Sequence, residues 1–400
     1  MESLYQLKGV VQPYSWGGNR FIPNLLGEVN AAQGPFAEYW LGAHPKAPSL
    51  LLNGSETTLD KVIESSPSEI LGESVQQQFG TLPYLLKILD VRQMLSIQVH
   101  PSVDAAKRGF AEEDEKGIPL TASNRNYKDQ NHKPELMAAL SDFWLLHGFK
   151  TEDGIRKIFA TVPEFSFLQK AFEENSYRGL YETVMTLPQE KVDEVLAPLM
   201  DKVLPLYLEG RLEKSDAHFW AARAVQTFCS NGHYDRGIFS IYFFNLLHLR
   251  EGEGIYQPAG LPHAYLEGQN VELMANSDNV LRAGLTDKHV DVPELMKHVK
   301  FEPTIPAIIP SREEMVHVYQ TPAAEFELTR LQLSETAFLA VETATIFFVY
   351  EGAVDLIAGM QTLLLKRGEA ALAIAGSQVE LKPNNCTAVV FAAATPVGKK

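Results

Sequence analysis

The apolar residues of this chain change their spacing twice, and that change limits the possible folds more than any other feature of the sequence. Residues 1 to about 150 contain short apolar runs separated by Gly and Pro, a pattern typical of short strands joined by turns. Between residues 151 and about 230 the spacing becomes that of an amphipathic helix. The clearest helical set is Val192, Val195, Leu196, Leu199, Val203 and Leu206. Strand-like runs return from residue 238, so we predict a mainly β fold with a helical insert.

A weak internal repeat lies in the strand-like regions. Residues 252–260 read GEGIYQPAG and residues 368–376 read GEAALAIAG, with the same spacing between their glycines. Three residues beyond the last glycine stands His263 in the first copy and Val379 in the second. The repeat favours two β-barrel units of one architecture, of which only the first keeps a polar residue at this position.

The composition limits the partners of the chain. Its 400 residues are enough for two or three domains, and its net charge of −15 makes it a poor general binder of nucleic acid or anionic membranes. An anionic ligand would therefore need a local cluster of cations. Two cysteines, Cys229 and Cys386, exclude a disulfide framework, and no apolar stretch reaches the length of a membrane span. The N-terminus has no pattern of a signal peptide, and we expect a cytoplasmic protein.

Three segments supply side chains that can bind one metal ion. Strand alternation in LSIQVHP (95–101) places Ser96, Gln98 and His100 on one face. Glu135 ends the segment NHKPE, and His263 follows the Pro/Gly turn of PAGLPHA, which gives its side chain a defined direction. Two imidazoles, a carboxylate and an amide oxygen suit zinc, iron or manganese. The interior of a β-barrel explains how strands far apart in sequence would bring them together.

The alternative for any single histidine is a hydrogen-bonded core or surface residue. Gln98 beside His100 on an otherwise apolar strand weakens that alternative, because buried polar atoms need partners. The spacing G-x5-P-x-G-x2-H that ends at His263 resembles the second metal-binding motif of the cupin barrels. Gln98 stands where the usual first cupin motif has a histidine, and Glu135 lies well downstream of it.

Several segments together are similar to the type I mannose-6-phosphate isomerase family. They are YSWGG (14–18), EYWLGAHPKAPS (38–49), LPYLLKILD (82–90), LSIQVHP (95–101), NYKDQNHKPE (126–135), LPHAYLEG (261–268) and VELMANSDNVLRAGLTDK (271–288). The resemblance runs from near residue 10 to about 300, and more loosely to the C-terminus. It implies one zinc ion per chain. The ligands that it implies are Gln98, His100, Glu135 and His263, with Arg282 as the catalytic arginine.

The resemblance also implies a fold and a reaction. The fold is two cupin-like (jelly-roll) β-barrels plus an α-helical domain. We expect residues 1–150 and 236–314 to form the metal-binding domain, 151–235 the helical insert, and 315–400 a cupin-like domain without metal ligands. The implied reaction interconverts mannose 6-phosphate and fructose 6-phosphate through a cis-enediol, with zinc as the electrophile.

This reaction needs a proton-transfer base near neutral pH. Glu272, nine residues after His263, is the candidate that the family suggests; the alternative is a surface glutamate on an edge strand. We expect His132 or Lys133 to open the sugar ring, and Arg282 to stabilise the enediolate or steer the proton.

The substrate phosphate needs the cationic cluster that the net charge demands. Lys87, Lys133, Arg282 and Lys288 all lie in the motif segments and can supply it. Ser96 shares a face with Gln98 and can donate a hydrogen bond to the substrate. Two other histidines in strand-like segments, His44 and His147, are expected to be structural.

Other functions remain open from the residues alone. Two histidines and a carboxylate can hold ferrous iron for an oxygenase, and a barrel can bind a sugar without turning it over. Gln98 and the cationic residues favour the isomerase over both, and the sequence shows no Gly-rich phosphate loop for an added nucleotidyl transfer. We expect a small-molecule sugar phosphate as partner, no nucleic acid, no membrane, and a monomer.

Overall fold

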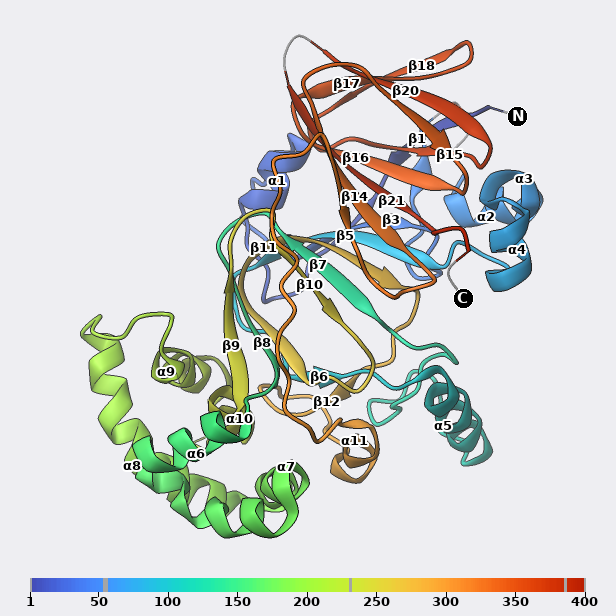
Figure 1. Ribbon diagram of the computed structural model, residues 1–400. Helices are drawn as coiled ribbons and strands as arrows, with labels where there is room; N and C mark the ends of the chain where they lie inside the picture. Colours follow the sequence, from blue (N-terminus) through green and yellow to red (C-terminus); the bar gives the residue numbers. More distant parts are fainter. Residues whose placement is uncertain (1, 53–56, 230–231, 385–386, 399–400) are drawn as a thin grey trace.

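The computed structural model describes residues 2–52, 57–229, 232–384 and 387–398, so Cys386 lies outside the described residues. Helix makes up 30% and strand 31%, so the fold is mixed helix and sheet; the predicted strands and helical insert are both present, with helix as abundant as strand. Figure 1 shows the C-terminal strands and the chain ends grouped on one side of the molecule, and the helices of the middle of the chain on the opposite side. The remaining strands lie between them.

A ten-stranded antiparallel sheet carries or adjoins the predicted metal ligands. Its longest strand is β11 (His263–Ala275), whose first residues pair with β6 (Gln98–Val99) and β8 (Phe143–Phe149). The later residues of β11 pair with β5 (Tyr84–Val91) and β7 (Glu135–Ala139). The other strands are β2 (Val10–Gln12), β3 (Glu38–Gly42), β9 (Phe244–Leu249), β10 (Gly254–Gln257) and β12 (Leu281–Arg282). Segments far apart in sequence therefore meet along β11.

Two further sheets hold the C-terminal strands. The four-stranded sheet contains β15 (Ala337–Val341), β17 (Ala353–Ala358), β18 (Gln361–Lys366) and β20 (Ser377–Pro383). The seven-stranded sheet contains β13 (Val316–Tyr319), β14 (Glu327–Leu333), β16 (Thr345–Glu351), β19 (Ala370–Ala373), β21 (Ala388–Ala394), β1 (Leu4–Lys8) and β4 (Leu50–Leu51). Because β1 pairs with β19, strands from both ends of the chain share this sheet. One apolar core joins it to the ten-stranded sheet, from Leu86 and Leu273 to Ile346 and Leu372.

The two copies of the sequence repeat have the same backbone turns. Gly252 and Gly260 have φ of 82°, and Gly368 and Gly376 have φ of 83° and 81°. Such left-handed conformations are open to glycine at little cost. Each pair flanks a short strand, β10 in the first copy and β19 in the second.

The middle of the chain is helical, as the spacing of its apolar residues predicts. Its helices are α6 (Glu152–Thr161), α7 (Gln169–Thr186), α8 (Gln189–Leu208), α9 (Ala217–Phe228) and α10 (Gly237–Phe243), with a 3-10 helix at Pro163–Leu168. In α8 the apolar stripe buries Val192, Leu196 and Val203. These side chains share one core with Ile97 and Val99. The helical segment is therefore packed directly behind the strand that carries Gln98.

Shorter helices also occur where the sequence predicted only strands and turns. They are α1 (Phe21–Leu26), α2 (Leu59–Ser65), α3 (Pro67–Leu71), α4 (Glu73–Phe79) and α5 (Val103–Glu115), and α11 (Val292–His298) follows β12. The prediction found the strands of the first 150 residues but missed these helices, because it followed the Gly/Pro punctuation and overlooked helical spacing, such as that of Leu59 and Ile63, both buried. Ser102 caps α5 by accepting a hydrogen bond from the Ala105 amide.

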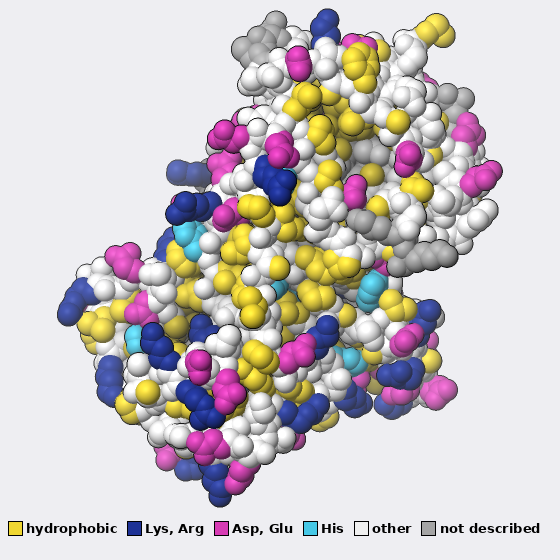
Figure 2. Space-filling view, in the orientation of Figure 1, with side chains coloured by type: hydrophobic (Ala, Val, Ile, Leu, Met, Phe, Trp, Pro, Cys, Tyr) yellow, Lys and Arg dark blue, Asp and Glu magenta, His cyan; other side chains and the backbone are white. Residues whose placement is uncertain are grey.

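The surface is mixed in character. Figure 2 shows charged side chains gathered over the helices in the lower part of this face and hydrophobic side chains over the strands in its middle. Among the described residues, no helix is both long enough and apolar enough to cross a membrane.

Candidate metal centre

His100, Glu135 and His263 form a compact buried group. Their ligand atoms lie within 4.8 Å of one another, and the three residues are 0%, 1% and 0% exposed. The Glu135 carboxylate lies between the two rings, with Oε1 3.3 Å from His100 Nε2 and Oε2 3.1 Å from His263 Nε2. The structure thus brings together three of the four predicted metal ligands from the end of β6, from β7 and from β11.

Backbone carbonyls orient both imidazoles. His100 Nδ1 donates to the Asn279 carbonyl at 2.8 Å, and His263 Nδ1 donates to the Leu261 carbonyl at 2.9 Å. A carbonyl can only accept, so Nδ1 of each ring carries a proton, and Nε2 is the atom that faces Glu135. Such hydrogen bonds are the usual way in which proteins orient a metal-binding histidine.

The protonation states at this group fit a cation. Burial lowers the pKa of His100 to about 4, so its ring is neutral near pH 7. Burial alone would raise the pKa of Glu135, but the Lys133 ammonium holds it well below its usual range. His100 Nε2 has no hydrogen-bond partner among the described residues, although it is fully buried. A lone pair therefore faces a carboxylate, and a divalent metal satisfies both.

Gln98 lies beside this group. In the sheet it is directly opposite His263 on one side and Arg282 on the other. Its side chain, like that of Ser96, lines a cavity of about 670 Å³, whereas Ile97 and Val99 point into the core shared with the helices. The predicted alternation therefore holds from Ser96 to Val99, whereas Leu95 lines the cavity together with Ser96.

The cavity over the metal group, called here the central cavity, is rich in cations. Six of its lining residues are Lys or Arg: Lys46, Lys87, Lys128, Lys133, Arg282 and Lys288. Three are acidic, Glu38, Asp278 and Asp287. Lys46 is paired with Asp278 at 2.7 Å. The cavity therefore provides the local positive charge that an anionic ligand needs on a protein of net charge −15.

A second buried polar group lies along β3, β5 and β11. Lys87 Nζ lies 3.2 Å from Glu272 Oε2 and 3.4 Å from Glu38 Oε2, and it sits 5.1 Å from the centre of the Trp40 ring. Tyr265 donates a hydrogen bond to Glu272 at 2.9 Å. Burial raises the pKa of Glu272, an effect that Lys87 partly offsets. Glu272 is thus a buried carboxylate of raised pKa, and the surface position considered for it is wrong.

The NHKPE segment divides its side chains between two environments. Lys133 Nζ lies 2.9 Å from Glu135 Oε1 and lines the central cavity. His132 instead pairs with Glu325, 2.6 Å away, and is absent from the lining. Adjacent residues of an extended chain point in opposite directions, so His132 and Lys133 cannot both face the cavity. The expectation that His132 reaches the substrate is not supported by its position.

Other residues at the site were not predicted from the sequence. Glu38 and Trp40 alternate on β3 and face Lys87, and Trp40 Nε1 donates to Glu38 at 2.5 Å. The alternation within EYWLG was a usable signal, but the pairing of β3 with β5 was not readable without the register. His44 and His147 are buried and do not belong to the metal group. His147 is also absent from the lining of the central cavity, whereas His44 lines it beside Asp278, so a purely structural role for His44 stays a prediction.

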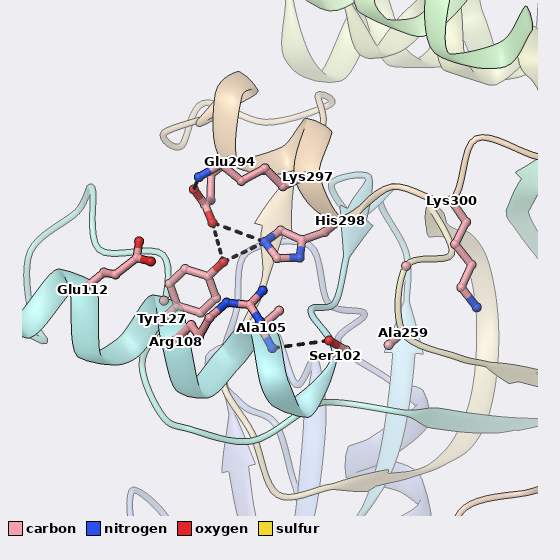
Figure 3. A pocket seen from close by; sticks show the side chains of 12 residues that line it. Ser102, Ala105, Arg108, Glu112, Tyr127, Ala259, Glu294, Lys297, His298 and Lys300 are labelled. Carbon is pink, nitrogen blue, oxygen red and sulfur yellow. Dashed lines mark hydrogen bonds and ion pairs between the residues drawn. The ribbon is translucent and has the colours of Figure 1, made fainter.

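A smaller cavity of about 270 Å³ lies between α5, α11 and the turn before β11 (Figure 3). Its polar centre is already paired: Tyr127 OH lies 2.6 Å from Glu294 Oε1 and 2.7 Å from His298 Nε2. Figure 3 shows Lys300 on the opposite side of the cavity from Glu112. None of the three residues of the metal group lines either cavity, but the central cavity adjoins the group through Gln98 and Lys133, and this smaller cavity has neither residue in its lining. The hydrogen bonds tie α11 to the segment after α5 and give this cavity a structural explanation.

Known proteins share both sequence and fold with this chain. Residues 4–152 match the family described as phosphomannose isomerase type I, catalytic domain. The mannose-6-phosphate isomerase of Escherichia coli K12 is 36% identical over 97% of this chain and 99% of its own length, and the human enzyme is 31% identical over 95% of each. The crystal structure of mannose 6-phosphate isomerase from Salmonella typhimurium, bound to fructose 6-phosphate and zinc, has a TM-score of 0.86 and 34% identity, covering 99% of this chain and 100% of that one. This chain belongs to the type I mannose-6-phosphate isomerase family.

Proposed function

We propose that this protein is a zinc-dependent aldose–ketose isomerase that interconverts mannose 6-phosphate and fructose 6-phosphate through a cis-enediol. The observation that carries the proposal is the buried group of His100, Glu135 and His263 at a cavity lined by six cations. The Salmonella relative bound to zinc and fructose 6-phosphate supports both the metal and the substrate. The cations of the lining suit a phosphorylated substrate, which neither an oxygenase nor a sugar-storage barrel requires.

Gln98, His100, Glu135 and His263 would hold the zinc ion. When bound, zinc supplies Lewis-acid polarisation of the sugar's oxygen atoms. The protein's part is to fix the two rings through Asn279 and Leu261 and to keep Glu135 ionised through Lys133. Gln98, a neutral ligand half-buried at the cavity wall, is the one that we expect to give way most easily to substrate.

The substrate's other groups would be held by the cavity walls. Ser96, Lys87 and Lys288 are the proposed contacts for the sugar phosphate, and Arg282, opposite Gln98 in the sheet, would stabilise negative charge on the enediolate. Lys133 is the proposed residue for ring opening, because it alone of the His132–Lys133 pair lines the cavity.

The proton transfer is assigned to Glu272. A base for this step must accept a proton from the carbon beside the carbonyl and return it to the neighbouring carbon. Burial raises the pKa of Glu272, which makes its carboxylate a stronger base. Glu272 does not itself line the central cavity, but Lys87, whose Nζ lies 3.2 Å from Glu272 Oε2, does. Tyr265 fixes the carboxylate from the other side.

The proposed architecture completes this picture. We propose two cupin-like jelly-roll barrels and an α-helical domain, with residues 1–150 and 236–314, 151–235 and 315–400 as their limits. The matching φ angles of Gly252, Gly260, Gly368 and Gly376 support a shared design of the two units. The proposed cytoplasmic location rests on the low cysteine content, and the proposed monomer is to be tested by light scattering.

The test is a coupled assay on purified protein that follows mannose 6-phosphate to fructose 6-phosphate. We expect activity that is lost on chelation and restored by zinc. Iron in place of zinc, with oxygen uptake, would support the oxygenase instead. Tight binding of the sugar phosphate without turnover by the zinc-loaded protein would support a binding barrel.

Gln98→His is expected to bind zinc about tenfold more tightly and to lower kcat by about tenfold, because an imidazole is a stronger ligand than an amide and yields less easily to substrate. Zinc affinity is measured by competition with a chelator and turnover by the coupled assay. Unchanged turnover with tighter zinc would show that Gln98 does not have to yield.

A further inference from the structure

The segment that follows Arg282 has an unusual conformation beside the central cavity. Leu285, Thr286, Asp287 and Lys288 line that cavity. Leu285 has φ of +52°, a left-handed conformation that a leucine keeps only where its surroundings hold it. Its side chain is buried in the core shared with the helices, so the residue is fixed on one side by packing.

The carboxylate of Asp235 holds the backbone of this segment. Asp235 Oδ1 accepts hydrogen bonds from the Leu285 amide at 2.7 Å and from the Gly237 amide at 2.6 Å. Asp235 Oδ2 accepts one from the Thr286 amide at 3.2 Å. One side chain from the helical segment therefore binds the strained residue, its successor and the start of α10. Hydrogen bonds to an ionised acceptor are the stronger kind.

Two glycines allow this close approach. A Cβ on Gly284 would lie 2.6 Å from Gly237 Cα, and a Cβ on Gly237 would lie 2.6 Å from the Leu285 amide nitrogen. Gly284 also has φ of +121°, which favours glycine. The close contact between the loop before α10 and the segment after β12 therefore depends on a glycine in each of them.

Both partners of this contact are anchored elsewhere. The Ala283 amide donates to the Ile97 carbonyl at 2.9 Å, and the Ile97 amide donates to the Gly284 carbonyl at 3.0 Å, so the segment is joined to the strand that carries Gln98. Arg236, next to Asp235, donates to the Met185 and Leu187 carbonyls of the helical segment. A shift at Asp235 would therefore reach the cavity wall between Arg282 and Lys288.

We propose that Asp235 is a positioning residue of the isomerase site, through which the helical segment sets the directions of Arg282 and Lys288 toward the substrate. The inference rests on the proposed function, since it gives Asp235 a role only if those cations face a sugar phosphate. On this proposal the helical segment orients cavity residues as well as covering the strands. Asp235 itself does not line the cavity, so its effect is on geometry.

The test compares Asp235→Ala, Asp235→Asn and Gly284→Ala with the wild-type holoenzyme. Misplacing a positioned cation by a fraction of an ångström lowers kcat/KM, and we expect a loss of about tenfold for Asp235→Ala. Asp235→Asn keeps an acceptor for the Leu285 amide but not for the Thr286 amide, and we expect kcat/KM to fall by about two- to threefold. Gly284→Ala forces the same contact apart from the other side and should reproduce the kinetic signature of Asp235→Ala.

Asp216→Ala is the matched control, because Asp216 also accepts a backbone amide hydrogen bond, from His218 in the first turn of α9, and does not line the cavity. Fructose 6-phosphate affinity is measured by calorimetry and zinc content by metal analysis. Weakened sugar-phosphate binding in both loop variants, with full zinc content, supports the proposal. Unchanged affinity and kinetics in folded Asp235→Asn and Gly284→Ala overturn it, as does a loss that parallels zinc loss. An inactive wild-type protein would refute the proposed function, while the calorimetry would still decide whether Asp235 positions the anion site.

Discussion

Glu272→Gln is expected to lower kcat by about 10²- to 10⁴-fold while the protein keeps its zinc. Glutamine has nearly the same shape but cannot accept the substrate proton. Glu272 is 3% exposed, and its carboxylate touches Lys87 and Tyr265, so the amide can occupy the same space. The coupled assay gives kcat, and metal analysis gives the zinc content.

Glu38→Gln is the matched control for this variant. Glu38 is the other carboxylate beside Lys87, at 3.4 Å compared with 3.2 Å for Glu272. Both substitutions remove one negative charge from the same lysine, so a purely electrostatic role would give similar losses. We expect Glu38→Gln to lose less than about tenfold. Equal losses would assign the proton transfer to another residue and leave Glu272 as a partner that keeps Lys87 charged.

Loss of either carboxylate beside Lys87 should also lower the thermal stability of the protein. Burial opposes the charged form of Lys87, but Glu38 and Glu272 more than offset it and raise its pKa. Each variant leaves the buried ammonium with one carboxylate in place of two, which is expected to destabilise the fold. The comparison of Glu272→Gln with Glu38→Gln therefore needs a thermal melt of each variant, so that a folding defect is separated from a catalytic one.

Local patterns in the sequence identified much of the metal group. The alternation of LSIQVHP placed Gln98 toward the central cavity and Ile97 in a core, and the Pro/Gly turn gave His263 its direction. The buried residues of α8 followed the predicted stripe. These features depend on neighbours along the chain, so a single sequence is enough to show them.

Features that depend on long-range pairing were not predictable in this way. Glu38, Lys87 and Glu272 meet only because β3 pairs with β5 and β5 with β11 in one register, and a shift of one residue would turn each side chain to the other face. The joining of β1 to β19 spans the whole chain and leaves no local mark. Asp235 was missed for the same reason, since its partners Leu285 and Thr286 are fifty residues away in sequence.

His132 was predicted as a candidate for ring opening from its sequence neighbours alone, and its position in the structure does not support that role. Its position beside Lys133 placed both as candidates for ring opening, yet Glu325, from the loop between β13 and β14, holds the imidazole at 2.6 Å. Burial would raise the pKa of Glu325, but the hydrogen bond from His132 lowers it. That partner lies nearly two hundred residues away, and only the packing of the C-terminal strands on the ten-stranded sheet reveals it.

His100→Ala is expected to lower zinc affinity by more than about 100-fold and kcat/KM by at least about 10³-fold at limiting zinc. The variant removes a ring whose Nε2 faces Glu135 at 3.3 Å and leaves that buried carboxylate with fewer partners.

His147→Ala is a demanding control. His147 lies directly opposite His263 in the sheet, is 4% exposed, and has a pKa lowered by burial to about 3, so it resembles His100 in burial and in its lowered pKa but lies outside the metal group. If burial and a depressed pKa were what mattered, both variants would fail alike. We expect His147→Ala to retain zinc and most of its activity, and equal zinc loss in the two variants would mean that the ligand set is wrong.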